Sequence, residues 1–201
     1  MISLGNSMKI TRWTRLAAAA LLLGLTACAG DGSGSSNSTT AAATGDSWQN
    51  FRVPGGDFAV SLPEAPKPGR DTTAKDGSVN KSYYLEESRC VYMVGYSSSP
   101  PWKGSSLDGR LDSTRDALSK RLGGKLRRER RFALGDSRAM EFVLDVPASA
   151  TSDGYTIRGR IYVKHAPAGK DLLYQTLVTG KPGIDRAAET TRFLESFRFF
   201  G

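Results

Sequence analysis

The residues best suited to catalysis are few in this chain, which has one histidine, His165, and two cysteines, Cys28 and Cys90. A Ser-His-Asp or Cys-His site would have to use His165. This residue lies in VKHAPAG, where an expected strand meets a Pro/Gly turn, and the chain contains no G-x-S-x-G nucleophile motif. We therefore expect an exposed side chain without a catalytic role. A hydrolase that acts through His165 is the alternative.

Metal and cofactor sites have little support in the sequence. Apart from Cys28, which ends the N-terminal apolar run, one histidine and one cysteine do not supply the usual nitrogen and sulfur ligands of zinc. The chain also has neither a P-loop nor a dinucleotide motif after a strand. We expect no metal and no cofactor. Cys90 begins an apolar segment, so we expect a small buried side chain, although a reactive or interchain thiol is the alternative.

A basic run, KLRRERR, covers residues 125–131 and is the strongest charge feature. Such a run can bind the phosphates of lipid headgroups or of an anionic polymer. It has no array of aromatic residues for base stacking, so we expect no nucleic-acid partner. The candidate anion-binding residues are Arg127, Arg128, Arg130 and Arg131.

Ordinary cross-strand pairing explains the same run without a ligand. If it pairs with the segment around Glu141 and Asp145, strict alternation lets these acids face Arg127 and Arg131. The two other arginines, Arg128 and Arg130, would lie on the opposite side without obvious partners. We favour this structural interpretation and keep the anion-binding surface as the alternative.

The composition is that of a globular protein with a moderately basic surface. The chain has 201 residues, 39% of them hydrophobic and 24% charged, with a formal net charge of +8. This length suits one ordinary domain with appendages. The positive charge suits anionic partners, but it also suits plain solubility.

An uninterrupted apolar run from Leu16 to Cys28 follows the basic segment MKITRWTR. The run is shorter than the ~20 residues of a membrane-spanning helix and fits the ~7–15 residues of a signal-peptide core. It ends in LTAC, which resembles the lipobox of bacterial lipoproteins. This resemblance implies that the Cys28 thiol receives a diacylglyceryl group and that a peptidase cuts before Cys28. We expect a signal peptide over residues 1–27, with translation starting at Met8; a buried N-terminal helix is the alternative.

A stretch rich in Gly, Ser, Thr and Ala then extends to residue 46, so residues 28–46 form the expected lipidated cysteine and flexible tether. Residues 29–46 would have a root-mean-square span of roughly 25 Å. The partners expected are the membrane, held through Cys28, and an unknown envelope protein or anionic ligand. The protein would face the extracytoplasmic side of either the cell membrane or the outer membrane.

Residues 47–201 are expected to form a single α+β domain. Seven segments have the alternation or apolar content of strands: FAVSLP, VNKSYYLE, CVYMVGYS, KLRRERRFAL, RAMEFVLDV, YTIRGRIYVKH and DLLYQTLVT. One helix is expected between Asp108 as cap and Gly123, and another after Asp185 as cap. Short connections predict an antiparallel sheet of about six to seven strands flanked by two main helices.

The same region resembles PsbP-like proteins, a group that includes bacterial lipoproteins of the DcrB type. The resemblance rests on FRVPGGDFAVSLPEAPK, VYMVGYSSSPP, LDGRLDSTRDALSKRLGG, FALGDSRAMEFVLDV and RFLESFRF. It implies an antiparallel sheet flanked by helices and a binding or assembly role without catalysis. No functional residue is carried over, and the photosystem-docking sequence of true PsbP subunits is missing before Trp48.

The lipid anchor can be tested by replacing its thiol. We expect Cys28→Ala to abolish acylation and normal cleavage, because the modified sulfur would be gone. Membrane fractionation and metabolic labelling with a fatty acid measure both effects. A variant that stays in the membrane fraction at the wild-type level would contradict the prediction.

Overall fold

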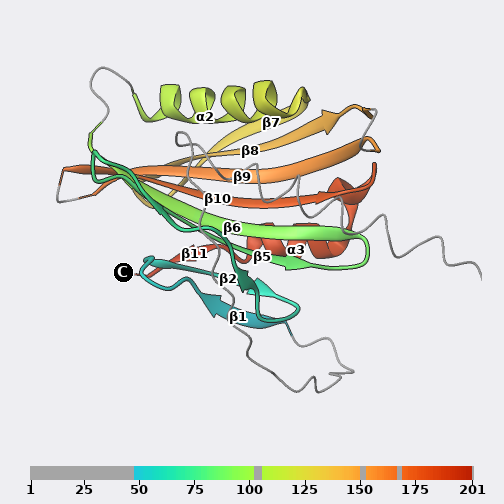
Figure 1. The fold of residues 1–201 in the computed structure, drawn as a ribbon, viewed down its shortest axis with the longest axis horizontal. Coiled ribbons are helices and arrows are strands. Elements are labelled where there is room, and N and C mark those ends of the chain that lie inside the picture. Colours follow the sequence, from blue (N-terminus) through green and yellow to red (C-terminus); the bar gives the residue numbers. More distant parts are fainter. Residues whose placement is uncertain (1–47, 102–105, 150–152, 167–168, 201) are drawn as a thin grey trace, which may run out of the picture.

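The computed structural model describes residues 48–101, 106–149, 153–166 and 169–200. They form a mixed α+β domain with a large antiparallel sheet, two helices and a small second sheet (Figure 1). The expected signal peptide and tether, residues 1–27 and 28–46, lie outside the described residues. No helix within the described ranges is long and apolar enough to cross a membrane.

The large sheet confirms the antiparallel arrangement expected from the short connections. Its strand order is β3-β5-β6-β10-β9-β8-β7, with β4 also paired to β5, and every registered pair is antiparallel. Two of its eight strands have only two residues each, so six long strands form its body. The strands are β3 (Lys67–Pro68), β4 (Thr72–Thr73), β5 (Val79–Glu86), β6 (Cys90–Ser99), β7 (Lys125–Leu134), β8 (Ser137–Val146), β9 (Tyr155–Ala166) and β10 (Lys170–Gly180).

Strand β6 lies in the interior of the sheet, between β5 and β10, as its sequence predicts. Its first six residues are all buried, so side chains on both faces need cover. Val91 and Met93 belong to the core on one face, whereas Tyr92 and Val94 belong to the core on the other.

Helix α2 (Leu107–Leu122) covers the first face. Leu111 and Leu118 pack in a cluster with buried side chains of β8 and β9. Gly123 ends the helix in a left-handed conformation, as predicted, because an αL residue there lets its N–H bond back to a helix carbonyl. The predicted cap is wrong: the Ser106 hydroxyl caps the helix through the Gly109 N–H, and Asp108 lies in the first turn.

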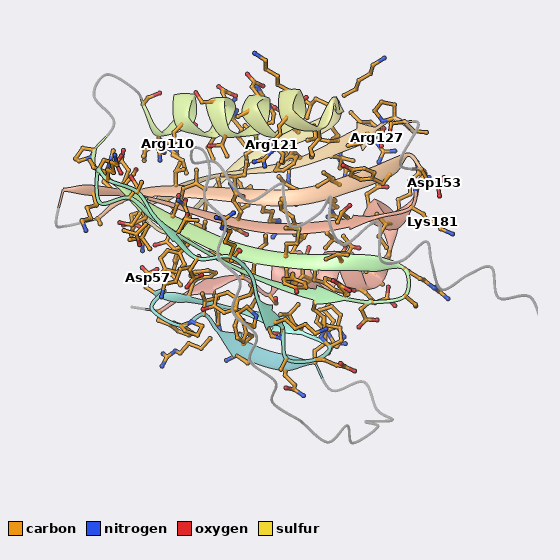
Figure 2. All side chains as sticks on the ribbon, in the orientation of Figure 1. Asp57, Arg110, Arg121, Arg127, Asp153 and Lys181 are labelled. Atoms are coloured by element: carbon orange, nitrogen blue, oxygen red, sulfur yellow. The ribbon has the colours of Figure 1, made fainter. Side chains whose placement is uncertain are left out.

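The second face is covered by α3 (Ala188–Glu195) and by a three-stranded sheet of β1 (Gln49–Arg52), β2 (Phe58–Leu62) and β11 (Arg198–Phe199). Aromatic rings dominate this core; for example, the rings of Tyr162 and Phe197 stack with centroids 3.9 Å apart. Asp57, labelled in Figure 2, lies just before β2. It links the small sheet to the large one by accepting hydrogen bonds from Tyr174 and Lys164 at 2.7 and 2.6 Å.

The final helix also begins differently from the prediction. Asp185 does not cap it, because Asp185 lies in the 3-10 turn η1 (Ile184–Arg186), where it is buried and paired with a strand residue. The residue before α3 is Ala187, which offers no side-chain cap. Burial of Phe193 and Leu194 against the second core therefore supplies most of the stability of this short helix.

Close packing in the middle of β9 gives a stability test. A Cβ atom at Gly159 would collide with the Leu177 side chain and lie 3.0 Å from both the Phe142 ring and the Thr176 carbonyl oxygen. We expect Gly159→Ala to lower the free energy of unfolding by about 1–3 kcal/mol, the usual cost of overpacking a core. Urea unfolding measures the change.

Gly109→Ala provides the matched control, because a Cβ there meets only the Ser106 Oγ at 3.4 Å. It should leave stability unchanged or raise it by up to about 1 kcal/mol, since alanine favours the helix. Equal stability of the two variants would contradict the packing of β9 described above.

Candidate functional site

The basic run forms most of β7, which lies at one edge of the large sheet. The register of β7 against β8 shifts between Leu126 and Arg128, which is a β-bulge. One extra residue in a strand changes which side chains share a face. Arg127 and Arg128 therefore both project to the α3 side, and the strict alternation assumed from the sequence fails at this point.

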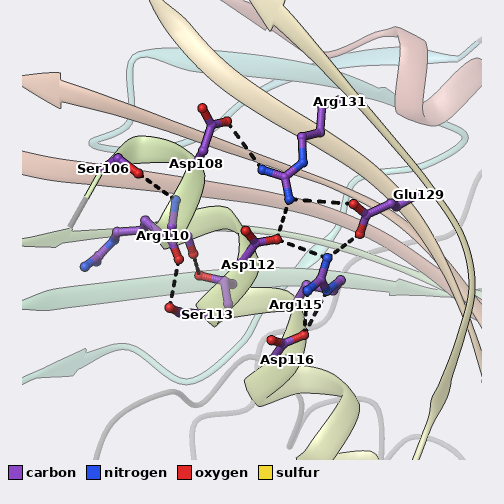
Figure 3. A network of polar contacts seen from close by, with 11 residues as sticks. Ser106, Asp108, Arg110, Asp112, Ser113, Arg115, Asp116, Glu129 and Arg131 are labelled. Carbon is purple, nitrogen blue, oxygen red and sulfur yellow. Dashed lines mark hydrogen bonds and ion pairs between the residues drawn. The ribbon is translucent and has the colours of Figure 1, made fainter.

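Arg131 projects to the other side and joins the network that links β7 to α2 (Figure 3). It pairs with Asp112 at 2.5 Å and with Asp108 at 3.6 Å, rather than with Glu141 as predicted. Arg115 of α2 completes the network. The two arginines share four acids, namely Asp108, Asp112, Asp116 and Glu129. Arg131 therefore has no surplus positive charge to offer an anion.

Arg127 is also held by acids of the protein. Its guanidinium lies 3.4 Å from the Asp145 carboxylate, as cross-strand pairing predicted, and 2.7 Å from that of Asp185. Asp185 comes from the distant η1 turn, so no sequence pattern could have identified it. Arg127 serves mainly to compensate this buried carboxylate.

Glu141 faces the two arginines that were expected to lack partners. Two residues of β9, the partly buried Arg158 and the buried Arg160, bind its carboxylate oxygens at 2.9 and 2.8 Å. Arg128 and Arg130 lie farther away, at 3.9 and 3.5 Å. Their side chains are 60% and 68% exposed, so both guanidinium groups stay in solvent although they lie near the Glu141 carboxylate.

Burial by itself would raise the pKa of Glu141, because a buried carboxylate is poorly solvated. The hydrogen bonds and charges of Arg160 and Arg158 outweigh this effect and hold the pKa below its ordinary value. Glu141 is therefore ionised at neutral pH, and its negative charge compensates the guanidinium groups of Arg158 and Arg160.

A groove of about 460 Å³ lies elsewhere, between the first half of α2 and strands β5, β6 and β10. Its volume is in the range of small-molecule sites. Arg110, on α2, marks it in Figure 2, far along the sheet from Arg127. Its lining includes Asn80, Ser82, Ser97, Ser99, Leu173 and Gln175 of the sheet and Arg110, Ser113, Thr114 and Ala117 of α2.

The groove combines polar side chains with a buried cation. Arg110 is only 8% exposed and donates a hydrogen bond to the Ser99 hydroxyl at 3.1 Å. Burial lowers the pKa of Arg110 and the charge of nearby Asp171 opposes that effect. An arginine stays protonated in such a site, so the groove has a fixed positive charge in its wall.

Sequence reasoning missed this groove, although one signal was present. Strand β6 changes from apolar residues to Ser97, Ser98 and Ser99 while it is still part of the sheet. A polar end on a central strand indicates that the elements packed over the strand no longer bury its side chains there. Nothing in the sequence placed α2 beside this end or put Arg110 in the wall.

His165 lies near the end of β9 with its side chain 66% exposed, as predicted, although within a strand rather than a loop. Its Nδ1 is 2.7 Å from the buried carboxylate of Asp171. In the register, Asp171 stands between His165 and Ser99. A nucleophilic triad needs the histidine in the middle, so this order does not activate Ser99.

Cys90 is free and 8% exposed, which agrees with the prediction of a small buried side chain. Burial raises the pKa of its thiol and so disfavours the reactive thiolate. Among the described residues no group of three or more His, Cys, Asp or Glu side chains is arranged to hold a metal ion. Cys28 lies outside the described part of the chain.

Comparisons with known proteins do not identify a family. No family model matches the chain, and no curated protein matches it. Among solved structures, a protein of unknown function from Pseudomonas aeruginosa, PA94, is similar, with a TM-score of 0.42 and 12% identity over 72% of this chain and 90% of that one. A similarity this loose carries no argument about function.

The arginine cluster around Glu141 predicts a pH-dependent loss of stability. Glu141→Gln should cost about 3–5 kcal/mol at neutral pH, because it leaves the buried guanidinium of Arg160 and the partly buried one of Arg158 without their carboxylate. The folded pKa of Glu141 is lowered, so its stabilising effect exists above the unfolded pKa and disappears as pH falls through the folded pKa. Urea unfolding at pH 7 and in the acid range below about pH 4 measures the difference, which should shrink in acid.

Glu195→Gln in α3 is the control, because Glu195 is exposed. It should change stability by no more than about 0.5 kcal/mol. If both variants were equally stable at neutral pH, Glu141 would not hold the cluster together.

Proposed function

We propose that this protein is a lipid-anchored extracytoplasmic binding module with a PsbP-like domain, and that it holds a small anionic ligand in the groove beside α2. The anchor is proposed on the signal-peptide pattern and the LTAC sequence before the tether. The antiparallel sheet with two helices is compatible with a PsbP-like domain. The membrane that holds Cys28 is either the cell membrane or the outer membrane.

The observation that carries the binding role is the groove itself. It joins several hydroxyl and amide side chains to an apolar part formed by Leu173, Ala117 and two prolines, Pro100 and Pro101. Such a mixture, with a few polar groups that can orient a ligand, is typical of small-molecule sites. A ligand there would contact both α2 and three strands of the sheet.

Charge favours an anion as the ligand. Three basic side chains line the groove, Arg70, Lys81 and Arg110, against one acid, Asp76. Asp171 acts on Arg110 electrostatically without lining the groove, so basic groups still outnumber acids. The planar guanidinium of Arg110 is suited to a carboxylate, sulfonate or phosphate.

A binding role without catalysis is also supported by the arrangement near His165. A hydrolase would need a nucleophile beside that ring, with the acid behind it. Here Asp171 separates the ring from Ser99. Asp171 instead connects His165 to the region of Arg110.

Anilinonaphthalene sulfonate, an amphipathic anion with a fluorescence response, can test the groove. The mature chain, residues 28–201 with Cys28→Ala, should bind it saturably at one site. Ala117→Glu should weaken binding about tenfold, because it adds a negative charge to the wall of the groove. Fluorescence titration gives the dissociation constant.

Lys120→Gln is the matched control, since it lowers the net charge equally from an exposed position of the same helix that does not line the groove. Binding should stay within about twofold of the parent. Thermal melts should show that all three proteins are folded. An equal effect of both variants, or the lack of saturable binding, would refute the proposed site.

A further inference from the structure

We infer that the arginine cluster on the α3 side of β7 is a docking surface for anionic phospholipid headgroups of the membrane that holds the tether. The surface, called the β7 basic surface below, consists of Arg128 and Arg130 above Arg158 and Arg160. Its orientation toward that membrane rests on the proposed lipid anchor. Its affinity for headgroups does not, because it follows from the charges of the folded domain.

Positive charge exceeds negative charge around Glu141. One carboxylate has two oxygens, and Arg158 and Arg160 already bind both at 2.9 and 2.8 Å. Among the described residues, Glu141 is also the acid that lies within 4 Å of Arg128 and Arg130. Four guanidinium groups therefore share one negative charge, and two of the four, those of Arg128 and Arg130, are exposed at the surface.

The other arginines of β7 are compensated by acids of the protein. Arg131, on the α2 side, is surrounded by acids, and Arg127 compensates Asp145 and Asp185. Among the arginines of β7, only Arg128 and Arg130 are both highly exposed and paired with an acid, Glu141, that is shared with other arginines and lies at least 3.5 Å away. The bulge is responsible, because it places these two residues over Glu141.

The two arginines of β9 give the cluster a fixed base. Arg160 donates to the Leu194 carbonyl at 3.0 Å, and Arg158 donates to the Thr191 hydroxyl at 2.8 Å, so both are held against α3. The Phe132 ring lies 5.8 Å from the Arg130 guanidinium and 5.3 Å from that of Arg160. Two exposed arginines on a rigid base can meet phosphate oxygens with little further loss of entropy.

The described part of the domain begins beside α3. Trp48 packs on Tyr92 with ring centroids 6.0 Å apart, and Arg192 of α3 lies over its ring at 4.7 Å. The chain thus enters the domain on the same side of the sheet as the β7 basic surface. A lipid anchor attached ahead of Trp48, as proposed above, would therefore hold this side of the domain toward the membrane.

Vesicle co-sedimentation tests the inference with the unlipidated chain, residues 28–201 with Cys28→Ala. It should bind vesicles of phosphatidylcholine mixed with phosphatidylglycerol, but not vesicles of phosphatidylcholine alone. Arg128→Gln with Arg130→Gln should weaken binding at least about tenfold, since each basic residue at an anionic surface contributes to affinity. Raising the salt from about 0.1 M to about 1 M should abolish binding, because the Debye length falls from about 10 to about 3 Å.

Two further variants separate this surface from net charge and from misfolding. Lys120→Gln with Arg121→Gln removes the same charge from the last turn of α2, on the opposite face, and should retain binding. Arg128→Lys with Arg130→Lys keeps the charge and should retain most of it. Equal losses in both Gln double variants would overturn the inference, as would the lack of vesicle binding.

Competition distinguishes lipid from other sources of phosphate. Inorganic phosphate at about 10 mM should displace little protein, because a headgroup surface offers many charges at once. Full displacement by free phosphate would overturn the lipid assignment. Failure of the anchor itself would appear separately, in fractionation of the Cys28→Ala full-length chain.

Discussion

A sheet whose middle strands are apolar on both faces must be covered on both faces, and the architecture of this domain follows from that requirement. Strands β6, β9 and β10 contribute buried side chains to two separate cores. Helix α2 covers one face, and α3 with the β1-β2-β11 sheet covers the other (Figure 1). Leaving either face bare would expose a patch far larger than a soluble domain usually tolerates.

Both proposed interaction sites lie where this cover ends. On the α2 face, β6 turns polar at Ser97, and the space between helix and sheet becomes the groove around Arg110. On the α3 face, the covering elements do not extend over Arg128 and Arg130 of the edge strand β7, so these two side chains remain exposed. The two proposed sites thus lie at the margins of the two cores, where polar groups can reach solvent without leaving a core unfilled.

The charged side chains of β7 also solve a structural problem of the edge strand. An exposed edge can pair with another chain, and closely spaced charges discourage that pairing. On one side of β7, pairs with α2 fix the strand to the helix; on the other, Glu141 and Asp185 fix it to β9 and η1. The surplus charge at Arg128 and Arg130 is what remains after these structural requirements are met.

Local patterns in the sequence determined the elements, and tertiary structure determined the sites. Period-two alternation and apolar content predicted the six long strands, the central position of β6 and the burial of Cys90, because these depend on which side chains must leave water. The partners of Arg127 and Arg131 could not be predicted. One bulge changes the faces of a strand, and the acids concerned come from distant elements, α2 and η1. The second sheet and the groove likewise depend on how the covering elements meet, which no local spacing encodes.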